Sequence, residues 1–349
     1  MTLVHFATNR EEKIQNGEVV GFTDRLNPKS PVYLRFGVAE MTPPAQSPPA
    51  FVVSELRVAP ESIPGVTVDA AEGKVLGSDQ VFEGLRVRLK ENSADLVLLL
   101  HGYACTVEDA LSNAAQLKTL WAPEDRLLET AVFSWPTNGE MMPWLDYASD
   151  RDDARSSAKA VARALQRLLD YLRSVPKADW CNANIHLVAH SMGNYLLRNA
   201  LQAMLSDLGE RPLPRIFKNI FLMGADEDND AFQDPRKLAR LPELAEAVHV
   251  YFARNDLALT IADTSKGLPD RLGSTGPRVL SSLPHKVTLV DCTDVSATSS
   301  VKDANHQYYR RRDEVIADVR QVLSGRMPEQ VKGREWIPSR HCFRIKPAT

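Results

Sequence analysis

A serine between small residues is the part of this sequence that points most directly to chemistry. Ser191 follows a short apolar run, residues 185–189, and precedes an amphipathic run, residues 195–204. Ala189 and Gly193 lie two positions before and after it, where larger side chains would clash in a tight turn. A strand, such a turn and a helix together expose a serine as a nucleophile. Without further matches, the serine would be better interpreted as a helix cap.

A second turn upstream can supply hydrogen-bond donors to a reacting oxygen. Residues 95–100 are continuously apolar, the pattern of a strand buried on both faces, and the turn that follows begins at His101. We expect the backbone N–H groups of Tyr103 and Met192 to form an oxyanion hole. His101 precedes the serine and is expected to be structural. His190 is adjacent to the serine in sequence and is a poor candidate for the base.

The acid that orients a catalytic histidine is predicted to be Asp256. It follows residues 247–253, which alternate and read as a late strand. Asp256 is also placed to cap a helix over residues 257–262, and it can serve both roles. Asp226 and Asp228, after an earlier strand, are the alternatives for the acid.

The base is predicted to be His306. Only three histidines follow Asp256, and two of them are poorly placed. His285 opens the apolar run 286–290 and so lies at the wrong end of that strand, while His341 lies in a basic tail. His306 lies in a polar loop before a helix-like stretch, residues 313–323.

Together these motifs resemble a family of bacterial alpha/beta-hydrolases of unassigned substrate that open with an Ala-Thr-Asn-Arg motif. The resemblance covers residues 6–323 and implies serine-hydrolase chemistry with Ser191, Asp256 and His306, but no substrate. The matching residues are Phe6-Ala-Thr-Asn-Arg10, Arg35-Phe-Gly37, His101-Gly-Tyr103, Phe133-Ser-Trp-Pro136, Ala189-His-Ser-Met-Gly193, Asn255-Asp256 and His306.

Composition narrows the class of protein. The chain has 349 residues, 44% of them hydrophobic, which is enough for one large domain with additions. A net charge of −3 gives no reason to expect nucleic acid or an anionic membrane as a partner. The four cysteines have no paired spacing, so we predict neither a zinc site nor a disulfide framework, and no metal or organic cofactor. Without a signal pattern or a run of about eighteen apolar residues, we expect a cytoplasmic enzyme with no membrane span.

The resemblance implies an alpha/beta-hydrolase fold, and the order of the predicted elements agrees with it. From residue 95 onward, strands alternate with helical patterns, which predicts a mostly parallel central sheet with helices on both faces. Residues 1–93 are expected to be a strand-rich antiparallel extension of this sheet, with strands at 32–36, 51–56 and 81–89. The clearest helix is predicted over residues 150–174, where apolar residues recur at helical spacing. We assign residues 94–325 to the catalytic core and residues 326–349 to a basic C-terminal tail.

One loop beyond the strand ends is rich in large apolar residues. It contains Trp135, Met141, Met142 and Trp144, which either line an acyl or alcohol pocket or anchor the loop on the core. The usual position of a lipase lid, after residue 223, holds only a short insertion without strongly apolar helices. This favours esters with small to medium acyl groups.

The predicted function is hydrolysis of a small-molecule carboxylic ester through an acyl-enzyme on Ser191, with His306 as base and Asp256 as orienting acid. The same three residues also serve amidases, peptidases and thioesterases. A non-catalytic interaction protein built on the same fold is the remaining alternative. The sequence leaves the oligomeric state open.

Overall fold

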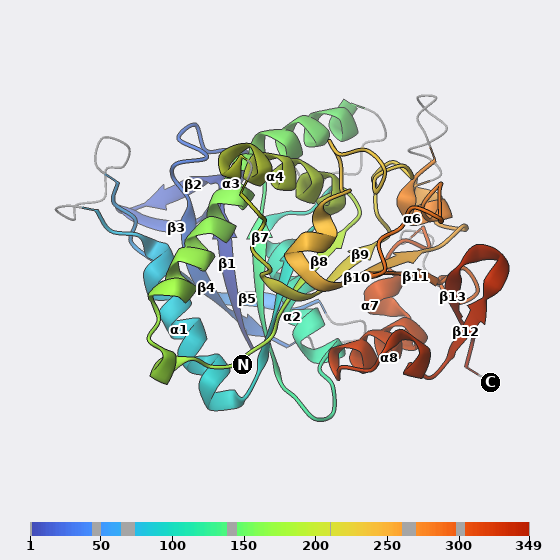
Figure 1. Cartoon of the computed structure of the whole chain (residues 1–349). Coiled ribbons are helices and arrows are strands. Elements are labelled where there is room, and N and C mark those ends of the chain that lie inside the picture. Colours follow the sequence, from blue (N-terminus) through green and yellow to red (C-terminus); the bar gives the residue numbers. More distant parts are fainter. Residues whose placement is uncertain are drawn as a thin grey trace.

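An eleven-stranded sheet runs through the whole molecule (Figure 1). The computed structural model describes residues 2–43, 50–63, 74–137, 145–209, 211–259, 270–297 and 304–348. The strand order is β12-β13-β11-β10-β9-β8-β6-β7-β1-β4-β5. The predicted fold class, an alpha/beta-hydrolase fold with a mostly parallel sheet, is confirmed.

Six neighbouring strands in the middle of the sheet are parallel to one another, so their carboxyl ends meet at one edge. Most of their residues are buried because helices cover both faces. The six are β6 (Asp95–Leu100), β7 (Leu128–Ser134), β8 (Ile185–His190), β9 (Phe217–Met223), β10 (Ala245–Phe252) and β11 (Val287–Asp291).

Two apolar cores lie on the two faces of the sheet, and successive residues of a strand alternate between them. Leu187 and Ala189 of β8 belong to one core, whereas Val188 between them belongs to the other. The first core includes side chains of α1 (Gly77–Asn92), α3 (Leu145–Ser174) and α4 (Gly193–Leu208). The second includes side chains of α2 (Val107–Leu120), α7 (Tyr308–Arg311) and α8 (Asp313–Leu323). Short helical turns fill the connections: η1 (Lys177–Asp179), η2 (Leu241–Leu244), α6 (Leu272–Thr275), η4 (Pro328–Gln330) and η5 (Pro338–Arg340).

The N-terminal region extends the sheet with antiparallel strands, as predicted. β1 (Thr2–Thr8) is parallel to β7 but antiparallel to β4 (Arg35–Thr42), which pairs with β5 (Val52–Val58). β2 (Arg10–Gln15) and β3 (Glu18–Leu26) form a separate hairpin.

Two expectations for this region were wrong in detail. Residues 81–89 form part of helix α1 and not a strand, because Val81, Leu85 and Leu89 recur every fourth residue and bury one helix face. The strand expected at 32–36 begins at Arg35 and runs on to Thr42.

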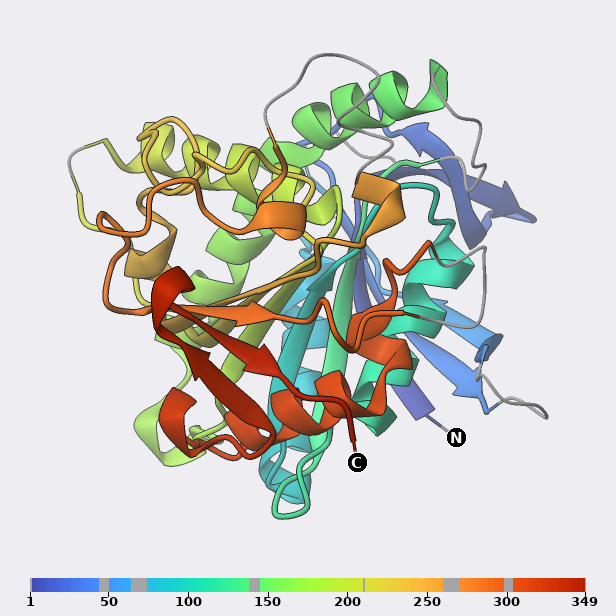
Figure 2. The ribbon, with the colours of Figure 1, turned by 90° about the vertical axis from the view of Figure 1, so that its right-hand side faces the viewer.

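The C-terminal region differs from the basic tail that we expected for residues 326–349. β12 (Arg334–Ile337) and β13 (Cys342–Ile345) form an antiparallel hairpin, and β13 pairs with β11 at the edge of the sheet (Figure 2). Two basic side chains of this region form ion pairs with carboxylates. Arg334 lies 2.7 Å from Asp318, and the Arg334 side chain is only 1% exposed. Arg344 lies 3.5 Å from the buried Asp291.

Replacing Arg334 by alanine should lower the free energy of unfolding by about 3–5 kcal/mol, because Asp318 would remain buried without its partner. Chemical denaturation of the purified protein measures this. The matched control is Arg236→Ala, which breaks an ion pair with Asp234 from a side chain that is 86% exposed. An equal effect of the two substitutions would show that the Arg334–Asp318 pair does not hold the C-terminal hairpin in place.

Candidate active site

Ser191 lies in a strained turn between β8 and α4. Its φ of +53° is in the left-handed region, which non-glycine residues rarely adopt. The Ser191 N–H donates to the carbonyl of Met223 over 3.0 Å, which fixes the turn against the end of β9. A Cβ atom on Gly193 would lie 2.4 Å from the carbonyl oxygen of Leu100, so only glycine allows α4 to begin here. The solvent-exposed fraction of Ser191 is 8%.

The turn after β6 packs directly against this serine. A Cβ atom on Gly102 would lie 2.9 Å from the Cβ of Ser191. Tyr103 is the next residue of the turn, and Ala104 after it has a left-handed φ of +49°. On the other side, the Met192 N–H has no hydrogen-bond acceptor among the described residues. The structure thus places the two predicted oxyanion donors, Tyr103 and Met192, on the two segments that flank Ser191.

His306 and Asp256 form a short hydrogen bond. The His306 Nδ1–H donates to Oδ2 of Asp256 over 2.6 Å, and Asp256 is completely buried. Asp256 follows β10, and its Oδ1 accepts from the N–H of Leu259, so it also caps the helical turn there. With Nδ1 protonated, Nε2 carries the lone pair that a base needs. Nε2 is buried and makes no hydrogen bond within the described part of the chain.

Gly224 and His190 connect the His306–Asp256 pair to the serine. Gly224 follows Met223, whose carbonyl accepts from Ser191, and a Cβ atom on Gly224 would lie 3.1 Å from Cε1 of His306. The ring of His190 lies 4.7 Å from that of His306, measured between centroids. The structure therefore brings Ser191, Asp256 and His306 together at the carboxyl ends of β8 to β10. Ser191 and His306 are not hydrogen bonded to each other, and such contacts commonly tighten only when substrate binds.

The three histidines around the site have different protonation behaviour. Burial alone would lower the pKa of His306, but the charge of Asp256, its hydrogen bond and the charge of Asp226 outweigh burial and raise this pKa. Burial holds the pKa of His190 well below its ordinary value. Burial and the charge of Arg10 lower the pKa of His101 to about 3. His306 is the one of the three that is set up to accept a proton and remain charged.

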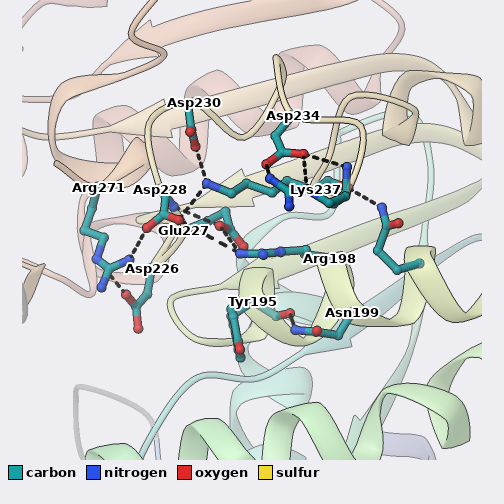
Figure 3. Close-up of polar contacts among 12 residues, drawn as sticks. Tyr195, Arg198, Asn199, Asp226, Glu227, Asp228, Asp230, Asp234, Lys237 and Arg271 are labelled. Atoms are coloured by element: carbon teal, nitrogen blue, oxygen red, sulfur yellow. Dashed lines mark hydrogen bonds and ion pairs between the residues drawn. The ribbon is translucent and has the colours of Figure 1, made fainter. Parts of the chain in front are cut away.

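The alternative acids, Asp226 and Asp228, are bonded elsewhere. The Tyr147 hydroxyl donates to Asp226 over 2.7 Å, and Arg271 lies 3.3 Å from the same carboxylate. Asp228 pairs with Arg271 at 2.8 Å and with Lys237 at 2.7 Å (Figure 3). Asp256, not either of these, is the carboxylate that is hydrogen bonded to His306.

The two rival aspartates belong to a charged cluster that sequence reasoning missed. In the same cluster Glu227 pairs with Arg198 at 3.0 Å, and burial raises the pKa of Glu227 to about 7 (Figure 3). A run of acids directly after an apolar strand was the signal in the sequence. Their partners come from α4 and from residues near 237 and 271, so only the fold reveals them.

Trp135 packs into the core beside His101. It is completely buried, stacks on His101 at a centroid distance of 5.2 Å, and donates its indole N–H to the His101 carbonyl over 3.0 Å. It therefore anchors the loop on the core, the second of the two interpretations above. Met141, Met142 and Trp144 lie outside the described residues. The rings of Tyr103 and Tyr147, 6.0 Å apart, are partly exposed beside the serine.

The described residues contain no group of three or more His, Cys, Asp or Glu side chains that could hold a metal ion. All four cysteines are free thiols. No helix in the described part of the chain is long and apolar enough to cross a membrane.

Comparison with known proteins agrees with the fold. A family model described as "Alpha/beta hydrolase of unknown function (DUF900)" matches residues 79–326, and the chain belongs to this family. An uncharacterized protein, alr1448, from Nostoc sp. (strain PCC 7120) is 31% identical over 169 residues, which cover 42% of this chain. The aligned part spans only 39% of the length of that relative. No solved structure matches.

Substituting the two buried aspartates should separate their roles. Asp256→Asn should lower kcat by about 10⁴-fold, because the imidazole loses the partner that fixes its tautomer and stabilises its charged form. Asp226→Asn should cost far less. Steady-state ester hydrolysis, normalised to folded protein by circular dichroism, measures both. A larger loss at Asp226 would move the acid to the end of β9.

The pH dependence of kcat/KM should show the raised pKa of His306. A general base must be neutral, so activity should rise with pH through a midpoint above about 6.5, the ordinary histidine value. Asp226→Asn should move this midpoint downward, because it removes one of the charges that favour the protonated ring. Asp152→Asn, at an exposed position on α3, should leave it unchanged. A wild-type midpoint at or below 6.5, within error, would exclude His306 as the titrating base.

Proposed function

We propose that this protein is a serine hydrolase that cleaves carboxylic esters through an acyl-enzyme on Ser191. The observation that carries the proposal is the 2.6 Å contact between His306 and Asp256, buried beside a serine in a strained turn. A buried His–Asp pair with a free Nε2 is the arrangement that activates a serine hydroxyl. Membership of an alpha/beta-hydrolase family supports hydrolytic chemistry but leaves the substrate open.

In this mechanism the Ser191 hydroxyl attacks the ester carbonyl while Nε2 of His306 takes its proton. Asp256 holds the Nδ1–H and stabilises the imidazolium that forms. The Tyr103 and Met192 N–H groups donate to the oxyanion, and the tight turn at Ser191 directs its Oγ toward the substrate carbonyl. His306 then protonates the leaving alcohol. It next activates a water molecule that releases the acid and restores the serine.

The surroundings of the serine favour small or medium acyl groups. The segment after β9, where a lipase would carry an apolar lid, contributes charged side chains instead, among them Asp226, Asp228 and Lys237. These charges are ion-paired and mostly buried, and no large apolar side chain of residues 224–244 is exposed, so this segment lacks the apolar surface that binds a triglyceride droplet. Amides and thioesters would use the same residues. The cytoplasmic location expected from composition stays a prediction.

The proposal is tested by labelling the protein with a fluorophosphonate and mapping the modified residue by mass spectrometry. We expect modification at Ser191, its loss in Ser191→Ala, and a strong decrease in His306→Ala. His285→Ala is the matched control, since His285 is exposed and lies at the opposite end of the sheet from the proposed site. A panel of esters, thioesters and anilides of graded acyl length then identifies the bond and the chain length.

Ser191→Ala should lower ester turnover by about 10³- to 10⁶-fold with an unchanged melting temperature. Ordinary turnover in this variant would refute the assignment of the nucleophile. If folded wild-type protein neither reacts with the probe nor hydrolyses any ester, the alternative of a non-catalytic interaction protein is favoured.

A further inference from the structure

Arg10 is a buried cation that has no carboxylate partner among the described residues. Its residue is 1% exposed, and no carboxylate in the described part of the chain lies within ion-pair distance of it. Its guanidinium donates to uncharged oxygens instead: to Oγ of Ser134 over 3.0 Å, to the carbonyl of Thr137 over 3.0 Å, and to the carbonyl of Cys105 over 2.8 Å. Burial lowers the pKa of Arg10 to about 10, so it stays charged at neutral pH.

The acceptors of Arg10 belong to segments that meet only in the folded protein. Ser134 ends β7, Thr137 lies in the loop beyond it, and Cys105 lies in the turn between β6 and α2. Burying an unpaired guanidinium is unfavourable, and its five N–H groups in a planar fork are suited to holding several carbonyls in a fixed arrangement. Arg10 therefore connects the start of β2 to two loops at the active edge of the sheet.

The turn held by Arg10 is the one that carries a proposed oxyanion donor. Cys105 is two residues after Tyr103, with the left-handed Ala104 between them. Thr137 reinforces the contact, because its hydroxyl donates to the Cys105 carbonyl over 2.5 Å and accepts from the Cys105 N–H over 2.8 Å. Since Gly102 has no space to spare against Ser191, a shift of this turn would move the Tyr103 N–H relative to the serine.

We propose that Arg10 is a positioning residue that fixes the turn 101–105 and thereby the Tyr103 N–H, the proposed oxyanion donor. The buried charge of Arg10 also adds to the positive potential at the oxyanion. The proposal rests on the proposed serine-hydrolase function for its catalytic part. The tether itself rests only on the four residues Arg10, Cys105, Ser134 and Thr137.

The test compares Arg10→Met with Arg35→Met. Arg35 is also a buried arginine of the N-terminal region, but it bonds to the Tyr33 hydroxyl and to Glu12. Both variants should melt at lower temperature than wild type. Arg10→Met should in addition lower kcat for a short ester about 10- to 100-fold with little change in KM, because loss of an oxyanion donor weakens binding of the transition state alone. Arg35→Met should keep kcat near the wild-type value.

Hydrogen exchange provides a readout that does not depend on activity. In Arg10→Met the Cys105 amide should exchange faster, and in Arg35→Met it should exchange as in wild type. Thr137→Val removes the acceptor of the same amide without touching a charge, so it tests the tether if Arg10→Met does not fold.

Unchanged exchange at Cys105 in Arg10→Met and Thr137→Val would overturn the tether, as would equal kcat losses in Arg10→Met and Arg35→Met. Faster exchange at Cys105 in a protein whose wild type hydrolyses no ester would support the tether but refute the proposed function. The two failures are therefore distinguishable.

Discussion

The close approach of three chain segments at the carboxyl edge of the sheet is the constraint on which the site depends. Gly193 allows α4 to begin against the Leu100 carbonyl, Gly102 allows the turn after β6 to rest on Ser191, and Gly224 leaves space for the His306 ring. A methyl group at the first two positions would overlap backbone or serine atoms, and one at Gly224 would crowd the imidazole. The parallel strands provide the common edge of the sheet. Because the three glycines have no side chains, the segments that carry the polar groups can pack against one another there.

Charge at this edge is arranged in two separate groups. Asp256 is buried and hydrogen bonded to His306, so its charge acts on the imidazole. Asp226 and Asp228 lie nearby but share Arg271 between them. Arg271 holds both aspartates in the segment after β9, although the charge of Asp226 still contributes to the raised pKa of His306. The separation explains how several carboxylates can lie around one active site with only one in contact with the base.

The sequence predicts those parts of the fold that depend on local patterns. Continuous apolar runs at residues 95–100 and 185–189 identify central strands because parallel strands are buried on both faces. Helix α1 was missed because Val81, Leu85 and Leu89 fall in a stretch that also alternates, and helical and strand spacing agree at every fourth residue. The C-terminal hairpin was missed because each of its strands has only four residues, one of them an arginine, and the pairing of these arginines with Asp318 and Asp291 exists only after folding.

In the candidate site, too, the sequence predicts some residues and the fold is needed to identify others. The order and context of Ser191, Asp256 and His306 single them out in the sequence, and the fold gathers them. The tether from Arg10 to Cys105 spans ninety-five positions and uses backbone carbonyls, which carry no sequence signal. Trp135 was ambiguous for a related reason: a large apolar residue in a loop has the same pattern whether it faces a ligand or the core.

The central claim is that the His306–Asp256 pair makes Ser191 a nucleophile, and trapping the acyl-enzyme tests it most directly. The protein is mixed rapidly with an activated short-chain ester, quenched in acid within milliseconds and examined by intact mass and peptide mapping. The account predicts a mass increase equal to one acyl group, located on Ser191, that appears before steady-state turnover and is absent when His306 is replaced by alanine. Turnover of the ester with an acyl group on another residue, or formation of the Ser191 adduct at the same rate without His306, would contradict it.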